Sequence, residues 1–152
     1  MNKSELKKRY IGAAITACGI ITAIFFYTVV AEILRYTGHK PLVPAPAAYV
    51  LKYVFYLIGV SAIAALKLAD SALDKKKETP RETAALLTLL AVTRAAICEM
   101  PAIAGLVLLI LTGNYTDFYL LTVFSIGLEI FHFPRLRQWE ERLRSDFGQL
   151  PE

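Results

Sequence analysis

The sequence predicts an all-α protein, a bundle of four transmembrane helices followed by a C-terminal amphipathic interfacial helix. Hydrophobic residues occupy 56% of the 152 positions and the mean hydropathy is +0.48, which is high for a soluble domain. Four apolar runs approach the roughly 20 residues that a helix needs to cross a bilayer. We therefore expect a four-span transmembrane domain over residues 1–133 and a cytoplasmic amphipathic tail over residues 134–152.

The placement of positive charge predicts the orientation of the chain. Basic residues gather before the first run, between the second and third, and after the fourth: Lys3, Lys7, Lys8, Arg9, Lys75, Lys76, Lys77, Arg81, Arg135, Arg137, Arg142 and Arg144. Cytoplasmic loops are enriched in such residues, so we predict a multi-pass protein of the bacterial cytoplasmic membrane with both termini cytoplasmic. Topology also accounts for the net charge of +4, and no nucleic-acid partner is expected.

The first run, Tyr10–Tyr36, predicts an uncleaved spanning helix, because it is much longer than the apolar core of a signal peptide. Glu32 lies near its outer end. The following connection, Thr37–Ala47, holds three prolines and should be short, stiff and non-helical. If the next helix packs antiparallel to the first, Lys52 reaches the depth of Glu32, and we predict that the two residues form an ion pair.

The second run, Ala48–Ala69, ends in a stretch of small residues that includes Gly59 and Ser61. Small residues let helix backbones approach closely, so this face is predicted to pack against another helix. The polar segment from Asp70 to Thr83 is expected to be a solvated cytoplasmic loop, with attraction to anionic lipid or a partner protein as the alternative.

The third run, Ala84–Thr112, carries Arg94 and Glu99 inside an otherwise apolar helix. A charged side chain at the centre of a spanning helix costs at least about 2.5 kcal/mol, so Glu99 should be paired, protonated or turned away from lipid. Pro101 removes a backbone donor and is expected to break or kink the helix beside this carboxyl group. Gly105 should let a neighbouring backbone approach closely.

The fourth run, Phe118–Phe133, places Glu129 about one turn from the cytoplasmic boundary, and Arg94 lies at a similar predicted depth. We therefore expect an ion pair between Arg94 and Glu129, with snorkelling of Arg94 to the lipid headgroups as the alternative. In the tail, apolar residues recur at helical spacing around Trp139, as in a helix that lies in the membrane interface. Trp139, Arg135 and Arg137 are the predicted interface residues; a docking surface for a soluble partner is the second interpretation.

Catalytic and metal-binding motifs are missing from the sequence. The two histidines, His39 and His132, fall on opposite sides of the predicted membrane, and Cys18 and Cys98 form no CxxC pair. Both cysteines are interpreted as small buried hydrophobic residues, with a redox role as the alternative. No P-loop, HExxH or GxSxG motif occurs. We therefore predict a protein that is not an enzyme and holds no metal or cofactor.

What chemistry remains is that of a carboxyl group in an apolar helix. Desolvation favours the protonated form of Glu99, and a carboxyl group that takes up and releases protons next to a helix break meets one requirement of an ion relay. A permanently protonated or paired structural glutamate is the alternative interpretation.

The run Glu99-Met-Pro-Ala-Ile-Ala-Gly105-Leu resembles the carboxylate helix of rotary ATPase c subunits, the proteolipids. Glu99, Pro101, Gly105 and Leu106 match the pattern of that helix, and the predicted cytoplasmic loop at residues 70–83 matches the hairpin orientation of the family. The repeated glycines of the family's first helix are replaced here by Gly59, Ser61 and alanines. The resemblance implies that Glu99 is an ion-binding carboxylate in an oligomer.

Two function classes follow from the sequence. The first is a non-enzymatic helical subunit or scaffold of a membrane complex, which meets the lipid bilayer and either copies of itself or other membrane proteins. The second is a proteolipid-like proton or cation carrier that works through Glu99. A small multidrug exporter, which also has four spans and a membrane glutamate, is less consistent with the position of Glu32 at the outer edge.

Overall fold

The computed structural model describes residues 3–73 and 79–148, and all regular secondary structure within these ranges is α-helical. The five helices are α1 (Lys3–Tyr36), α2 (Ala45–Leu73), α3 (Pro80–Thr112), α4 (Tyr115–His132) and α5 (Leu136–Phe147). The all-α prediction is therefore confirmed. The lysine triplet at residues 75–77, which was predicted to be cytoplasmic, lies outside the described residues.

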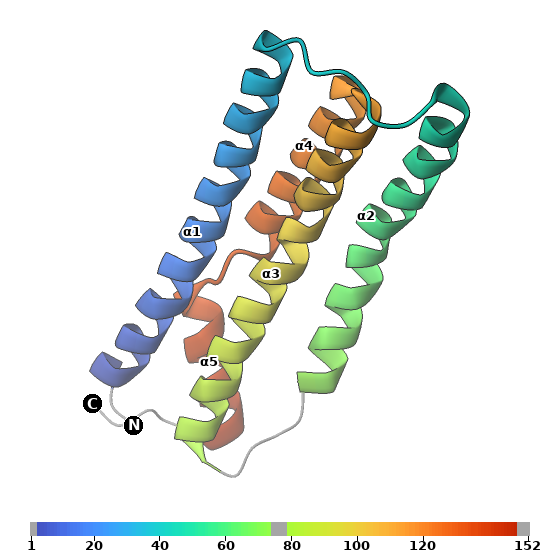
Figure 1. Ribbon diagram of the computed structural model, residues 1–152. Coiled ribbons are helices and arrows are strands. Elements are labelled where there is room, and N and C mark those ends of the chain that lie inside the picture. Colours follow the sequence, from blue (N-terminus) through green and yellow to red (C-terminus); the bar gives the residue numbers. More distant parts are fainter. Residues whose placement is uncertain (1–2, 74–78, 149–152) are drawn as a thin grey trace.

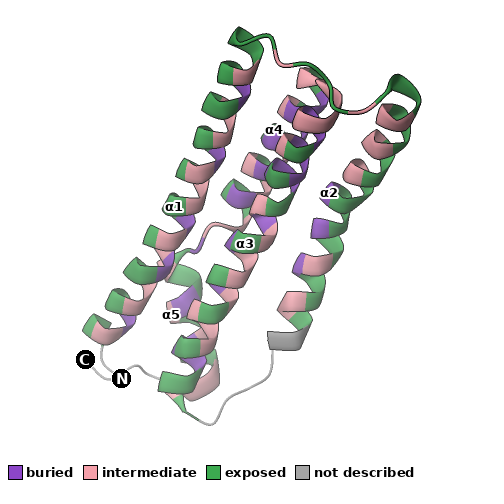
Figure 2. Ribbon diagram, in the orientation of Figure 1, coloured by how far each residue is buried: buried purple, intermediate pink, exposed green. Residues whose placement is uncertain are grey.

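Helix α3 is the centre of the molecule, and it packs against all four other helices. It lies between α1 and α2, which run along opposite sides of it, while α4 packs along its whole upper half (Figure 1). Helices α1 and α3 point in one direction, and α2 and α4 return in the other. Burial is concentrated on α3 and α4, whereas the outer faces of α1 and α2 are exposed (Figure 2).

Both ends of α3 are fixed by local sequence. The Thr79 side chain accepts a hydrogen bond from the Glu82 N–H, and Pro80 occupies the first turn, where its missing N–H costs nothing. At the other end Gly113 adopts φ 69°, and its N–H donates to the Leu109 carbonyl. Asn114 then caps α4 by accepting from the Asp117 N–H, so the turn between the helices is short.

The crossing from α1 to α2 is tied to the C-terminus of α3. The Leu42 and Val43 N–H groups donate to the Leu111 carbonyl at 2.9 and 3.1 Å, and His39 Nε2 lies 2.9 Å from the Ile110 carbonyl. These bonds satisfy carbonyl groups that the end of a helix leaves open. The predicted crossing extended to Ala47, but α2 already begins at Ala45.

Three helices, α1, α2 and α3, are long and apolar enough to cross a membrane. Helices α4 and α5 meet this condition only as a pair, with a bend of 45° between them, which would make up to four spans. Many large apolar side chains on α1 and α2 are exposed, including Phe25, Phe26 and Leu57. Exposed apolar surface of this extent is typical of contact with lipid or with another protein.

Pro101 does not end α3, so no break occurs there, and the kink expected beside Glu99 stays a prediction. The helix is continuous from Pro80 to Thr112, and Pro101 is buried inside it. Proline can remain within a spanning helix when neighbouring groups compensate for the lost backbone bond. The Ser125 hydroxyl of α4 donates to the Cys98 carbonyl, which neighbours the Ile97 carbonyl that Pro101 leaves without its helical donor, and Gly59 of α2 lies against the proline ring. Helices α2 and α4 thus pack closely around Pro101.

Two glycines mark the closest helix contacts. A Cβ atom at Gly105 would lie 3.0 Å from Leu121 Cβ and 3.2 Å from the Phe118 carbonyl oxygen of α4. A Cβ atom at Gly59 would lie 2.9 Å from Leu121 Cδ2. Ser61, expected on the same packing face as Gly59, is instead exposed and donates to the Ile58 carbonyl. It is two positions from Gly59 and thus roughly opposite it on the helix.

Helix α5 belongs to a core cluster with the cytoplasmically predicted ends of α1 and α3. Trp139 and Leu143 are 5% and 0% exposed and pack with Leu6, Ala13 and Ala84. The Trp139 ring meets the Tyr10 ring edge-on at 5.8 Å between centroids. Trp139 is therefore largely covered by protein side chains, and its position at the level of the membrane interface stays a prediction. Its predicted companions Arg135 and Arg137 are exposed.

Candidate functional site

Glu99 lies between α1 and α3 and has a neutral partner. The Tyr27 hydroxyl of α1 donates to Glu99 Oε1 at 2.5 Å. Tyr27 follows the fully buried Ile24 by one turn, so the face that packs α1 onto α3 also carries this phenol toward the carboxyl group. Glu99 is therefore paired, and its partner is a neutral phenol and not a cation.

Glu129 of α4 is the second carboxyl group at this site, and it is 2% exposed. The Cys98 thiol lies close enough to the Glu129 carboxyl group to interact with it. The carboxyl oxygen Oε2 of Glu129 is buried and finds no hydrogen-bond partner in the described part of the chain. Glu99 and Glu129 are near enough to interact electrostatically. We call Tyr27, Cys98, Glu99 and Glu129 the acidic cluster.

The spacing of residues on α4 explains why Glu129 turns inward. Phe118, Thr122, Ser125 and Glu129 follow one another at intervals of three and four, which places them on one helix face. All of them are buried against α3. The Thr122 hydroxyl, like Glu129 Oε2, has no hydrogen-bond partner among the described residues. The face of α4 toward α3 is thus polar at three successive positions.

The two carboxyl groups of the acidic cluster have no ion-pair partner in the described residues, although Arg94 is near enough to Cys98 to interact with it electrostatically. Across residues 3–73 and 79–148, neither Glu99 nor Glu129 forms an ion pair with a lysine or arginine. A buried ionised carboxylate without a partner costs several kcal/mol, and uptake of a proton or a cation removes that cost. No group of three potential metal ligands occurs in the described residues.

Arg94 does not pair with Glu129, contrary to the prediction. Its Nε donates to Asp70 Oδ1 of α2 at 2.8 Å. The Arg94 and Asp70 side chains are 30% and 41% exposed, whereas Glu129 is almost fully buried. An ion pair that keeps contact with solvent pays a smaller desolvation penalty than one in the interior, which favours Asp70 as the partner.

The predicted pair between Glu32 and Lys52 is also absent. Lys52 lies 3.0 Å from Asp117 Oδ1, and Glu32 accepts a hydrogen bond from Tyr119 and lies 3.9 Å from Arg35. The physical reason is the order of helices in space: α1 and α2 lie on opposite sides of α3, so Glu32 and Lys52 do not face each other. Asp117 is only 2% exposed and also accepts from Tyr56 and Asn114.

Several residues of the site escaped the sequence analysis. Neither Tyr27 nor Ser125 was predicted to be a site residue, and Cys98 was expected to be a small buried hydrophobic residue or, as the alternative, a redox group. A usable signal existed on α4, where Thr122, Ser125 and Glu129 share a helical face in an apolar run. The two cysteines also differ, since Cys98 is buried as expected and Cys18 is exposed.

Comparison with known proteins adds no relative. No protein-family model matches the chain, and no curated protein or solved structure is significantly similar to it.

Proposed function

We propose that this chain is a non-enzymatic integral membrane subunit that binds and releases a proton or small monovalent cation at the acidic cluster. The observation that carries this proposal is Glu129 Oε2, a buried carboxyl oxygen next to a second carboxyl group, with no hydrogen-bond donor and no ion-pair partner among the described residues. In an apolar bundle such an arrangement is stabilised when an ion or proton is bound.

The neutral partners of the two acids support reversible binding. The Tyr27 hydroxyl can donate to Glu99 when the carboxyl group is ionised, and the Cys98 thiol can donate to Glu129 in the same state. A lysine or arginine in their place would hold the carboxylates ionised and oppose proton uptake. The similarity of the run from Glu99 to Leu106 to the proteolipid carboxylate helix agrees with a role for Glu99 in ion binding.

Carbodiimide labelling tests this function. Purified protein in liposomes is treated with a hydrophobic carbodiimide, which reacts with protonated carboxyl groups in apolar surroundings, and the modified residue is identified by peptide mass spectrometry. We expect modification at Glu99 or Glu129, protection by a bound cation, and loss of proton uptake in Glu99→Gln. Glu32→Gln is the matched control, since Glu32 is exposed and lies outside the acidic cluster. Labelling confined to surface acids, or unchanged proton uptake in Glu99→Gln, would contradict the proposal.

A second function, that of a scaffold or helical subunit, has its own supporting observation. Cβ atoms built at Gly12 and Gly19 of α1 would meet nothing within 4 Å, and the two glycines lie seven positions apart on one face. Small residues on an open face allow a second helix to approach closely. We expect native mass spectrometry to find an oligomer or a co-purifying membrane protein. The double change Gly12→Leu with Gly19→Leu should reduce the fraction of the chain found in that complex. A monomer without any partner would argue against this function.

A further inference from the structure

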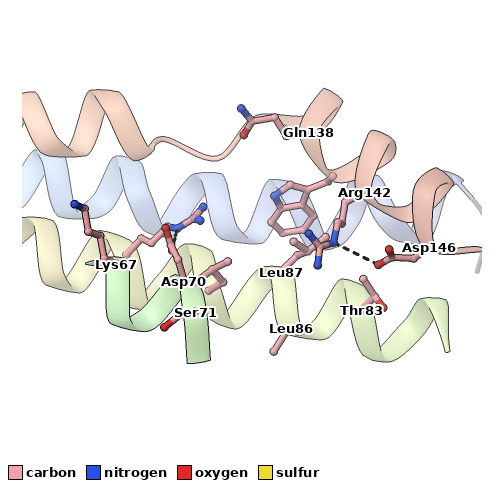
Figure 3. A pocket seen from close by; sticks show the side chains of 12 residues that line it. Lys67, Asp70, Ser71, Thr83, Leu86, Leu87, Gln138, Arg142 and Asp146 are labelled. Carbon is pink, nitrogen blue, oxygen red and sulfur yellow. Dashed lines mark hydrogen bonds and ion pairs between the residues drawn. The ribbon is translucent and has the colours of Figure 1, made fainter. Parts of the chain in front are cut away.

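A second polar site lies away from the acidic cluster, at the end of the molecule that holds both described chain termini. A cavity of about 520 Å³ opens between the last turns of α2, the first half of α3 and α5. In Figure 3, Asp70 and Ser71 of α2 lie toward one end of the cavity, and Arg142 and Asp146 of α5 lie toward the other with Thr83 of α3. The side chains of Lys67 and Gln138, which also line the cavity, point away from Arg142. The volume of the cavity lies within the range of small-molecule sites, about 300–1,000 Å³.

The charges around the cavity favour an anionic group. Its lining includes the cations Lys67, Arg94 and Arg142 and the carboxylates Asp70 and Asp146. Each carboxylate is already paired, Asp70 with Arg94 and Asp146 with Arg142, through the Nε atom of the arginine in both cases. The exposed Lys67 has no carboxylate within ion-pair distance in the described part of the chain. The positive charge that remains at this site is therefore that of Lys67.

The floor of the cavity is apolar. Leu86, Leu87 and Leu90 of α3 and the Trp139 ring line it beneath the charged groups. This combination of a charged rim and an apolar base suits an amphiphile better than a free inorganic ion. Phosphate groups are bound by arginine forks and by lysine ammonium groups, and basic pockets between spanning helices are known positions for anionic lipid headgroups.

The depth of the cavity also fits a headgroup. Helix α3 has 33 residues and is about 50 Å long, which exceeds the ~30 Å of hydrocarbon. Counting roughly 20 residues back from Thr112 reaches the turn that carries Arg94. The same count from the start of α2 at Ala45 ends just before Lys67. Both cations thus lie near the boundary where lipid phosphates are found.

We propose that this cavity binds the phosphate-bearing headgroup of an anionic phospholipid, with Lys67, Arg94 and Arg142 at the phosphate and the leucines and Trp139 against the glycerol backbone. The site is independent of ion binding at the acidic cluster, and neither proposal depends on the other.

Lipid retention measures the proposed binding. The full chain is placed in nanodiscs of a zwitterionic lipid with a small fraction of phosphatidylglycerol or cardiolipin, extracted in mild detergent and examined by native mass spectrometry. We expect anionic lipid to remain bound to the wild type, and Lys67→Gln to lower the retained fraction about fivefold. Lys8→Gln is the matched control, because Lys8 is exposed at the same end of the molecule and does not line the cavity.

The single tryptophan of the chain gives a second readout that does not depend on extraction. Trp139 lines the cavity, so its emission should change when anionic lipid is added and should change less in Lys67→Gln. Equal lipid retention by Lys67→Gln and Lys8→Gln would overturn the proposal. A tryptophan response that soluble glycerol phosphate saturates in the absence of lipid would also overturn it, because the source of the phosphate would then be a soluble metabolite.

Discussion

At the scale of single residues, Gly105 shows how one missing side chain sets the distance between α3 and α4. Replacing it with alanine would place a Cβ atom 3.2 Å from the Phe118 carbonyl oxygen and 3.0 Å from Leu121 Cβ, both positions that a rotamer change cannot relieve. We expect Gly105→Ala to destabilise the protein by about 1–3 kcal/mol. Thermal aggregation in detergent measures the change.

The matched control is Gly127→Ala. Gly127 is in α4, where a Cβ atom would meet nothing within 4 Å, and alanine favours a helix over glycine by about 1 kcal/mol. This variant should be as stable as the wild type or more stable. Equal destabilisation by Gly105→Ala and Gly127→Ala would show that the close contact of Gly105 with α4 does not set the distance between α3 and α4.

The pair between Lys52 and Asp117 is a second contact that one residue can test. Asp117 is 2% exposed, and removal of the lysine leaves its carboxylate with only Tyr56 and Asn114 as side-chain donors. We expect Lys52→Met to destabilise by about 1–3 kcal/mol, less than for a fully buried pair because the Lys52 side chain is 38% exposed. Urea unfolding in detergent provides the measurement. Glu32→Gln should leave the free energy of unfolding nearly unchanged. If Glu32→Gln destabilises the protein as much as Lys52→Met does, the pair between Glu32 and Lys52 that was expected from the sequence is favoured.

At the scale of helices, α5 is held by side chains of α1 as well as α3. Leu6 is 1% exposed and belongs to the same cluster as Trp139 and Leu143. Truncation of a buried leucine costs about 2–5 kcal/mol, so Leu6→Ala should loosen α5. Because Trp139 is the only tryptophan, we expect its emission to shift to the red and its quenching by acrylamide to rise.

Leu68→Ala is the comparison for this experiment. Leu68 is at the same end of the molecule but is 68% exposed on α2. Its truncation should leave the Trp139 emission unchanged. If Leu6→Ala also leaves the emission unchanged, the tryptophan does not depend on α1, and the position at a lipid interface predicted from the sequence becomes the better description.

The helices themselves could be predicted from the sequence, and their neighbours could not. Apolar runs bounded by prolines, Gly113 and Asn114 locate the helices because these residues end or cap them whatever the surrounding fold. The pair between Glu32 and Lys52 was predicted wrongly because the prediction assumed that α1 and α2 pack side by side, whereas α3 separates them and Lys52 meets Asp117, 65 positions away. The pair between Arg94 and Glu129 was predicted wrongly although α3 and α4 do pack together, because Arg94 pairs with the more exposed Asp70 of α2.

At the scale of the whole molecule, charge and polarity divide along the bundle axis. The start of α1, the start of α3 and the whole of α5 meet at one end, and they carry most of the described basic residues (Figure 1). The acidic cluster lies farther along the bundle, where α3 contacts both α1 and α4. The proposed lipid site is at the basic end and the proposed ion site is inside the bundle, so the two sites belong to different environments.

This division leads to a prediction about topology. If the basic end faces the cytoplasm, single cysteines introduced at Arg81 and Arg144 should react with an impermeant thiol reagent only in inside-out vesicles. A cysteine at Lys40, in the crossing between α1 and α2, should react from the opposite side. Cys18 and Cys98 must first be replaced by serine and alanine, since Cys18 is exposed on α1 and would add its own signal. Because α4 and α5 are joined by a bend, Arg144 is the decisive position. Labelling of Arg144 from the side of Arg81 requires α4 to cross the membrane, either by itself or together with α5. Labelling from the side of Lys40 would mean that α4 and α5 do not cross the membrane and that α5 is not at the basic end.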